Sequence, residues 1–320
     1  MKKGIKFLLT IIFIGNFSLY GQIINDVEDY TIYTSDINHF WEAYDSLSTA
    51  KNIEDSLNVI NQYYLKKKSV GLEEFIKVRP EFTGESYIAA IRTFPLFWNS
   101  IRKRTENINV EINAIKQSFE KIKNIYPEFE IPDVCFAISP IMTGGTTSED
   151  NNIILLGTEL AAIDSTIDLS EFPKQVKKIL GNIYIPYFVI HESIHTAQNP
   201  LTGESGVFLE TMMEGSAEFI TTYLLETSYQ KKSNEYGYKH EKELWDKLKV
   251  DIENNTNFNK WFGDYYQNKY PDLGYFFGYK IMQSYYKKSS DKKQALIDII
   301  KLNYPEKIFK ESGYNGTKDN

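Results

Sequence analysis

The chain has 320 residues, 42% of them hydrophobic and 25% charged, with a formal net charge of −7. A chain of this length and apolar content can bury a sizeable core. The single cysteine, Cys135, excludes an internal disulfide, and the lack of a basic stripe or arginine-rich run argues against nucleic acid as a partner.

Residues 1–21 have the layout of a secretory signal peptide. A basic start, Met1–Lys6, precedes the apolar run Phe7–Phe17, and the polar mature chain begins near Gln22. Removing three lysines and no acid takes the net charge from −7 to −10. The apolar run is shorter than the roughly 20 residues of a membrane span. We therefore expect a secreted or periplasmic protein with no stable membrane insertion after cleavage.

Two features of this start leave an alternative open. The cleavage region, Ser18–Gly21, is not a clean Ala-x-Ala, so an uncleaved signal that tethers the chain to the membrane is the second interpretation. No cysteine follows the apolar run, so we do not expect a lipid-modified amino terminus.

The first part of the mature chain, residues 22–130, is predicted to be helical. Apolar residues recur at helical spacing after Thr34-Ser35-Asp36, which we expect to cap the first helix. A second stripe, in steps of four and three, predicts a long helix with one apolar face. The two stripes are Ile37, Phe40, Trp41, Tyr44 and Leu47, and then Ile108, Ile112, Ile115, Phe119 and Ile122.

Extended structure is predicted next along the chain. Val134–Ile138 and Ile153–Leu156 are short apolar runs typical of strands, and the glycine-containing Thr143–Thr147 links them. Cys135 lies inside the first run, so we expect a buried and unreactive thiol.

The pentad His191–His195 reads His-Glu-x-x-His. Pro186 suits the first turn of a helix and Asn199-Pro200 should end it, so the pentad is predicted to be helical. Residues four apart share a helix face, so both imidazoles can reach one metal ion. The helix is apolar on most sides and should be buried; its apolar residues are Ile183, Tyr187, Phe188, Ile190 and Ile194.

Eighteen residues separate His195 from an acidic residue, Glu214, which lies on the predicted helix Val207–Thr227. Two histidines and a glutamate would hold one Zn²⁺ per chain and leave its fourth position open, as in catalytic zinc sites. Glu192, beside the ion, would then act as general base toward a zinc-bound water.

The rest of the chain is again predicted to be mostly helical. Leu273–Tyr286 and Ala295–Leu302 are apolar helices, and the short polar tail, residues 312–320, is expected to fray. No linker is evident, so we expect the helical region 22–130 to pack onto a catalytic part spanning residues 131–311.

The motif and its surroundings resemble the gluzincin branch of zinc metallopeptidases, and more closely an uncharacterised bacterial family of predicted zinc-dependent proteases. The resemblance covers roughly residues 30 to 300, although only the metal motif is specific. Besides the pentad and Glu214–Phe219, the residues that carry it are Asp36-Ile37-x-x-Phe40-Trp41, Gly144-Gly145-Thr146 and Gly274-Tyr275-x-x-Gly278-Tyr279. It implies a mostly helical α+β, zincin-like fold with a small antiparallel sheet before the active-site helix.

The resemblance also implies roles for further residues. Asn152–Leu156 would be the edge strand that pairs with an extended peptide, or else an ordinary buried strand. Glu218 would orient a ligand histidine, and Tyr279, or Tyr275 one turn earlier, would stabilise the oxyanion.

Three functions fit this sequence. The leading prediction is a zinc peptidase that hydrolyses a peptide or protein substrate. The second is an envelope binding or assembly factor that keeps the fold and the metal without catalysis, or with little of it. The third is a zinc hydrolase of a non-peptide amide, such as a cell-wall fragment.

Overall fold

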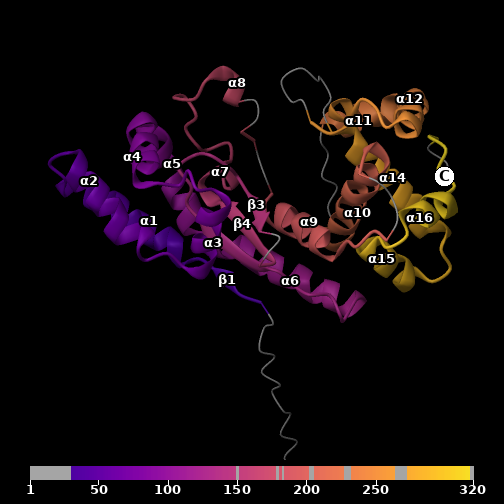
Figure 1. Cartoon of the computed structure of the whole chain (residues 1–320), viewed down its shortest axis with the longest axis horizontal. Helices are drawn as coiled ribbons and strands as arrows, with labels where there is room; N and C mark the ends of the chain where they lie inside the picture. The colour runs from indigo at the N-terminus through magenta and orange to yellow at the C-terminus, as the bar shows by residue number, and fades with distance from the viewer. Residues whose placement is uncertain are drawn as a thin grey trace, which may run out of the picture.

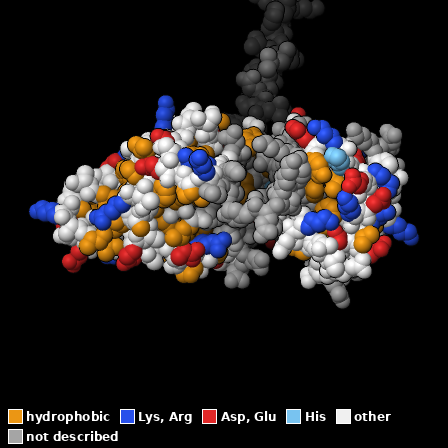
Figure 2. Space-filling view, turned by 90° about the horizontal axis from the view of Figure 1, so that it is seen from above, with side chains coloured by type: hydrophobic (Ala, Val, Ile, Leu, Met, Phe, Trp, Pro, Cys, Tyr) orange, Lys and Arg blue, Asp and Glu red, His pale blue; other side chains and the backbone are white. Residues whose placement is uncertain are grey.

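The computed structural model describes residues 30–148, 151–177, 180–181, 184–201, 205–226, 232–263 and 272–317. A sheet lobe, β1–β4 with α1–α8, lies beside a helical lobe, α9–α16, and α6 runs beneath both (Figure 1). On the face in Figure 2, basic and acidic side chains are interspersed over both lobes. The expectation of a mostly helical α+β chain is confirmed.

The sheet has the strand order β1-β2-β4-β3. β1 pairs with β2 and β2 with β4 in parallel, whereas β3 pairs with β4 antiparallel. The expected antiparallel sheet is therefore wrong, because the sheet is mixed. The strands are β1 (Ile32–Tyr33), β2 (Asp133–Ala137), β3 (Thr146–Ser148) and β4 (Ile153–Gly157). Since β1 lies far upstream of the other three, the amino-terminal region shares one sheet with the residues that follow it.

The edge strand is not the one expected. β4 lies between β2 and β3, and all five of its residues are buried, so Asn152–Leu156 cannot offer a free edge to a peptide. The edge strands are β1 and β3, and β3 is formed by the end of the segment expected to be only a glycine-containing link. Three residues with little apolar content carry too weak a pattern to predict a strand.

The helices of the sheet lobe cover the sheet and one another. They are α1 (Ser35–Ser46), η1 (Leu47–Thr49), α2 (Ile53–Ile60), η2 (Asn61–Leu65), α3 (Val70–Val78), α4 (Gly84–Thr93), α5 (Pro95–Glu106), α6 (Asn109–Ile125), α7 (Thr158–Ala161) and α8 (Lys174–Lys177). α1 and α6 confirm the two predicted apolar stripes, with Phe40 and Phe119 fully buried. Cys135 is also fully buried, and burial raises the pKa of its thiol.

The expected cap of α1 forms differently. Thr34 stands at the helix start without a side-chain capping bond. Asp36 instead accepts hydrogen bonds from the backbone and the hydroxyl of Ser69, the residue that caps α3. The acidic residue therefore ties α1 to α3.

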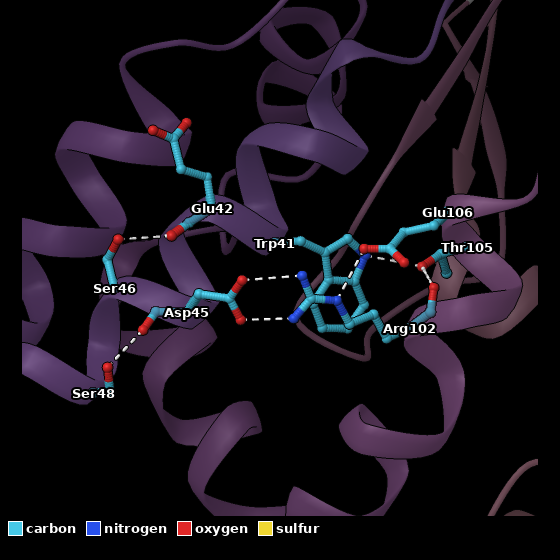
Figure 3. Close-up of polar contacts among 8 residues, drawn as sticks. All are labelled: Trp41, Glu42, Asp45, Ser46, Ser48, Arg102, Thr105 and Glu106. Atoms are coloured by element: carbon cyan, nitrogen blue, oxygen red, sulfur yellow. Dashed lines mark hydrogen bonds and ion pairs between the residues drawn. The ribbon is translucent and has the colours of Figure 1, made fainter.

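A polar cluster joins α1 to α5 (Figure 3). Arg102 binds both carboxylate oxygens of Asp45, at 2.6 and 3.0 Å, and its Nε donates to Glu106 at 2.9 Å. Its guanidinium lies 5.1 Å from the ring centre of Trp41, whose Nε1 donates to Thr105. The bidentate geometry sets the position of the two helices.

A buried carboxyl joins the loops that follow β2 and β4. Glu159, at the start of α7, is fully buried and accepts hydrogen bonds from the backbone and the hydroxyl of Ser139. The chain passes so closely here that a Cβ on Gly157 would lie 1.9 Å from the carbonyl oxygen of Thr143. This contact places the loop that leads into β3.

In the helical lobe, α10 lies between α9 and α14. The helices are α9 (Ile185–Ala197), α10 (Val207–Leu225), α11 (Lys232–Lys239), α12 (Glu241–Asn254), α13 (Phe258–Trp261), α14 (Leu273–Lys288), α15 (Lys292–Lys301) and α16 (Pro305–Ser312). A Cβ on Gly215 would lie 2.2 Å from the Cα of Gly278, and one on Gly278 would lie 2.0 Å from the carbonyl oxygen of Thr211. α10 and α14 therefore cross with their backbones in contact.

The tail is packed rather than frayed at Ser312. Tyr314 is buried and donates to Glu241 of α12 at 2.7 Å, and Gly316 lies against the Trp245 ring. Residues 318–320 lie outside the described residues.

The predicted signal, residues 1–21, also lies outside the described residues. Within the described ranges, no helix has both the length and the apolar character needed to cross a membrane.

Replacing Glu159 by Gln should flatten the pH dependence of stability. Burial raises the pKa of Glu159 from 4.5 to about 8, against the opposing hydrogen bonds of Ser139. The folded state then holds a proton that the unfolded state releases, so stability falls as pH rises from 4.5 to about 8. A neutral amide removes this loss, which is on the order of 5 kcal/mol.

Thermal unfolding at about pH 5.5 and pH 8.5 measures the effect. The melting temperature of the wild type should drop more between the two than that of Glu159→Gln, whereas exposed Glu54→Gln should follow the wild type. Equal drops in all three proteins would contradict the prediction.

Candidate metal centre

α9 presents both histidines of the pentad on one face. Pro186 stands in its first turn and the helix ends at Ala197, just before Asn199-Pro200, as predicted. Val189, Ile190 and Ile194 are fully buried, so the helix is fixed by packing on its apolar sides. Ile183, expected in the same helix, lies outside the described residues.

α10 brings Glu214 to the two imidazoles, as the spacing predicted. An oxygen of Glu214 lies 3.0 Å from Nε2 of His191 and 3.4 Å from Nε2 of His195, and the two nitrogens are 3.1 Å apart. Donors bound tetrahedrally at about 2.1 Å from zinc lie about 3.4 Å from one another. The three atoms thus have nearly the mutual spacing of ligands around one ion.

This group could hold a metal ion. His191, His195 and Glu214 each offer one ligand atom within 4.8 Å of the others. Among the described residues, these three form the cluster of histidine, cysteine and acidic side chains that could bind a metal. Their side chains are only 11%, 20% and 14% exposed. Ligand atoms on side chains this deeply buried need polar partners, and one cation would satisfy all three together.

The charges of the group are strongly coupled. Burial alone would lower the pKa of His195, but the hydrogen bond and charge of Glu214 outweigh it and raise that pKa to about 9. For Glu214, burial would raise the pKa, but hydrogen bonds and charge from His191 and His195 lower it well below its usual range. Without metal, the carboxylate thus acts as counter-ion to the imidazole of His195.

Gln198 is a residue of the site that sequence reasoning missed. Its Oε1 lies 2.9 Å from Nδ1 of His195, and its Nε2 donates to the carbonyl of Met213 on α10 at 2.8 Å. A proton on Nδ1 leaves Nε2 free to bind a metal. The signal available was its position three residues after His195, too common a spacing to single it out.

Aromatic rings, rather than a side-chain amide, surround His191. It lies nearly parallel to Tyr187 and Tyr275, at 6.3 and 6.2 Å between ring centres, while its buried Nδ1 has no hydrogen-bond partner in the described residues. Glu218, buried on α10, accepts a hydrogen bond from the Tyr187 hydroxyl. Glu218 thus connects to His191 through Tyr187, whereas the sequence predicted that it orients a ligand histidine itself.

Tyr279 packs against α10 through Phe219. Its ring lies 5.8 Å from that of Phe219, and its hydroxyl accepts a hydrogen bond from Gln283 at 3.2 Å. Burial raises its pKa. The oxyanion role of Tyr279 and Tyr275 stays a prediction, and neither lines the cleft described next.

A cleft of about 720 Å³ opens beside the metal group. Glu192, His195 and Glu214 line it from α9 and α10, together with β3 and the loop after α6. The structure therefore places Glu192 next to the metal ligands, facing the same space, as the pentad predicted.

The comparisons with known proteins identify the family. The family model described as gliding motility protein GldB matches residues 22–316. The chain belongs to this family. Neither the curated proteins nor the solved structures searched contain a match to it.

The family corrects three predictions. The assignment to gluzincin peptidases is wrong, because the GldB model covers nearly the whole mature chain. The predicted zinc peptidase function, with its hydrolase and metalloprotease descriptions, is wrong for the same reason. His-Glu-x-x-His with a distant glutamate can form a set of metal ligands, but the motif alone does not specify a reaction.

The family also bears on location. Its model carries a lipoprotein label, which agrees with an amino-terminal signal and a place at the cell envelope. The printed sequence has one cysteine, Cys135, which lies buried in β2.

Gln198→Ala should weaken metal binding without unfolding the protein. Losing the bond to His195 frees its ring to turn, and such losses cost about 10- to 100-fold in affinity. Gln198→Glu keeps an acceptor for Nδ1 but loses the donor to Met213, so its affinity should lie between those of Gln198→Ala and the wild type. Titration calorimetry with Zn²⁺ as the probe measures both, and equal affinities for Ala and wild type would exclude the positioning role.

Proposed function

We propose that this protein is a metal-holding binding or assembly factor at the cell envelope that acts in gliding motility. Its membership of the gliding motility protein GldB family supports the process, and the basic and apolar start supports export. The proposal takes up the second function that the sequence allowed. The observation that carries the metal part is the convergence of three donor atoms from α9 and α10.

Zinc is the metal that we propose, one ion per chain. Two imidazole nitrogens and one carboxylate oxygen form a donor set that zinc accepts readily, and the near-tetrahedral spacing of the donors suits it. When bound, zinc supplies a Lewis-acidic centre with room for a further ligand. His191 and His195 would join it to α9, and Glu214 would join it to α10.

A partner protein is the ligand that we propose for the cleft. The cleft is large enough for side chains of another chain and reaches the metal donors at His195 and Glu214. A donor atom of the partner can then complete the coordination of the metal. In this proposal the metal strengthens binding, and Glu192 transfers no proton.

Purified wild-type protein, residues 22–320, should bind one zinc per chain. His195→Ala should lower the affinity by at least about 100-fold, because one of three protein ligands is lost. His240→Ala is the matched control, since that histidine is exposed on the surface and does not belong to the group. Elemental analysis and calorimetry give the stoichiometry, and a wild type free of zinc after dialysis with it would refute the metal site.

Complementation of a strain that lacks this protein should separate a binding role from a catalytic one, with gliding as the measurement. Complementation with Glu192→Gln should restore gliding, because the amide keeps the shape of the side chain and only removes its capacity to accept a proton. His195→Ala should restore little. Immunoblots confirm equal protein levels, and a non-gliding Glu192→Gln strain at normal level would favour a catalytic role instead.

A further inference from the structure

We propose that the cleft binds an extended, lysine- or arginine-rich segment of a partner protein, added as a strand to the free edge of β3. This inference rests on the proposed function and names the chemistry of its partner. The surface between the sheet and the metal group carries it.

Acidic side chains predominate in the cleft. The carboxylates of Glu128, Glu130 and Glu210 line it with the metal-group Glu214 and Glu192. His195 is the basic side chain among the described lining residues, which include no lysine or arginine. The face drawn in Figure 2 mixes both signs. Lys301 comes near, lying 5.6 Å over the ring of the lining residue Tyr126, but is not part of the lining.

Among the described residues, no lysine or arginine pairs with Glu128, Glu130 or Glu210, and the basic group that acts on Glu210 is His195. Within the described ranges, no ion pair or side-chain hydrogen bond joins Glu128, Glu130 or Glu210 to another residue, and Glu210 is partly buried. Most carboxylates on α12, by contrast, are paired with lysines, such as Glu243 with Lys247 at 2.6 Å. An excess of negative charge in a concave site attracts a ligand of the opposite sign.

The backbone of β3 supplies the second half of the site. Among the described strands β3 pairs only with β4, so its outer edge has backbone donors and acceptors without a strand partner. Thr147 and Ser148 line the cleft at this edge. Ser148 donates to Glu74 of α3 at 2.7 Å, which holds the strand rigid. A rigid free edge is the usual platform for strand addition.

The two features select one kind of partner. A free edge needs an extended peptide backbone, and alternate side chains of such a strand point to one side, where the carboxylates of Glu130 and Glu210 lie within the same cleft. Nucleic acid and anionic lipid are repelled by the same charge. A basic extended peptide satisfies both the backbone edge and the acidic wall.

Peptide binding tests the inference directly. The probe is a fluorescein-labelled peptide of about nine residues that alternates Lys and Thr, about 30 Å long when extended. Fluorescence anisotropy follows its titration with zinc-loaded residues 22–320, next to a matched Glu-Thr peptide. The Lys-Thr peptide should bind and weaken with added salt, and the Glu-Thr peptide should not bind.

Two changes separate charge from backbone pairing. Glu130→Gln with Glu210→Gln should weaken binding about fivefold, while Glu54→Gln with Glu85→Gln, on exposed positions of α2 and α4, should leave it unchanged. A Lys-Thr peptide N-methylated at alternate residues should bind at least about tenfold more weakly, since one edge loses its donors.

The outcomes distinguish this inference from the metal proposal. Equal binding of the Lys and Glu peptides, no effect of the paired Gln substitutions, or no effect of N-methylation overturns the cleft inference even where zinc binds. The titration is repeated on metal-free protein. Specific peptide binding there supports the cleft even where the zinc measurement fails.

Discussion

The close crossing of α10 and α14 is the contact on which the metal group depends. At Gly215 and Gly278 the two backbones touch, and a side chain at either position would force the helices apart. Glu214 immediately precedes Gly215, so this crossing fixes its place beside α14, and the packing of α9 on α10 then sets its distance from the histidines. Helix positions set by packed backbones are rigid, which suits donors that must converge within a few tenths of an ångström.

The sheet lobe forms the opposite wall of the cleft, and buried polar contacts hold that wall in place. The neutral carboxyl of Glu159 holds the loop after β2 against the start of α7, and Glu74 holds Ser148 of β3. Both carboxyl groups hold neighbouring segments in place and have no assigned role in a reaction. The cleft thus lies between an edge strand fixed by buried polar contacts and a helix pair fixed by apolar packing.

The sequence predicted those parts of the site that follow from helix periodicity. His191 and His195 lie four apart, and Pro186 and Asn199-Pro200 bound their helix, so α9 and its ligand face could be derived. The edge strand could not, because strand order depends on long-range pairing and β3 offers only three residues. Gln198 was also out of reach, since its role depends on the carbonyl of Met213 on another helix.

Three converging donors define a metal site, and the residues around them decide its use. Hydrolysis needs a base beside the metal and a donor for the developing oxyanion. Glu192 could serve as the first, and the oxyanion role of the tyrosines stays a prediction: Tyr275 lies along His191, and Tyr279 packs on Phe219. The cleft is also lined by several carboxylates and by the edge strand β3, and in the proposed function these features hold a partner. Membership of a motility family agrees with such a role, because a binding factor gains from a metal that fixes two helices and accepts a partner's donor.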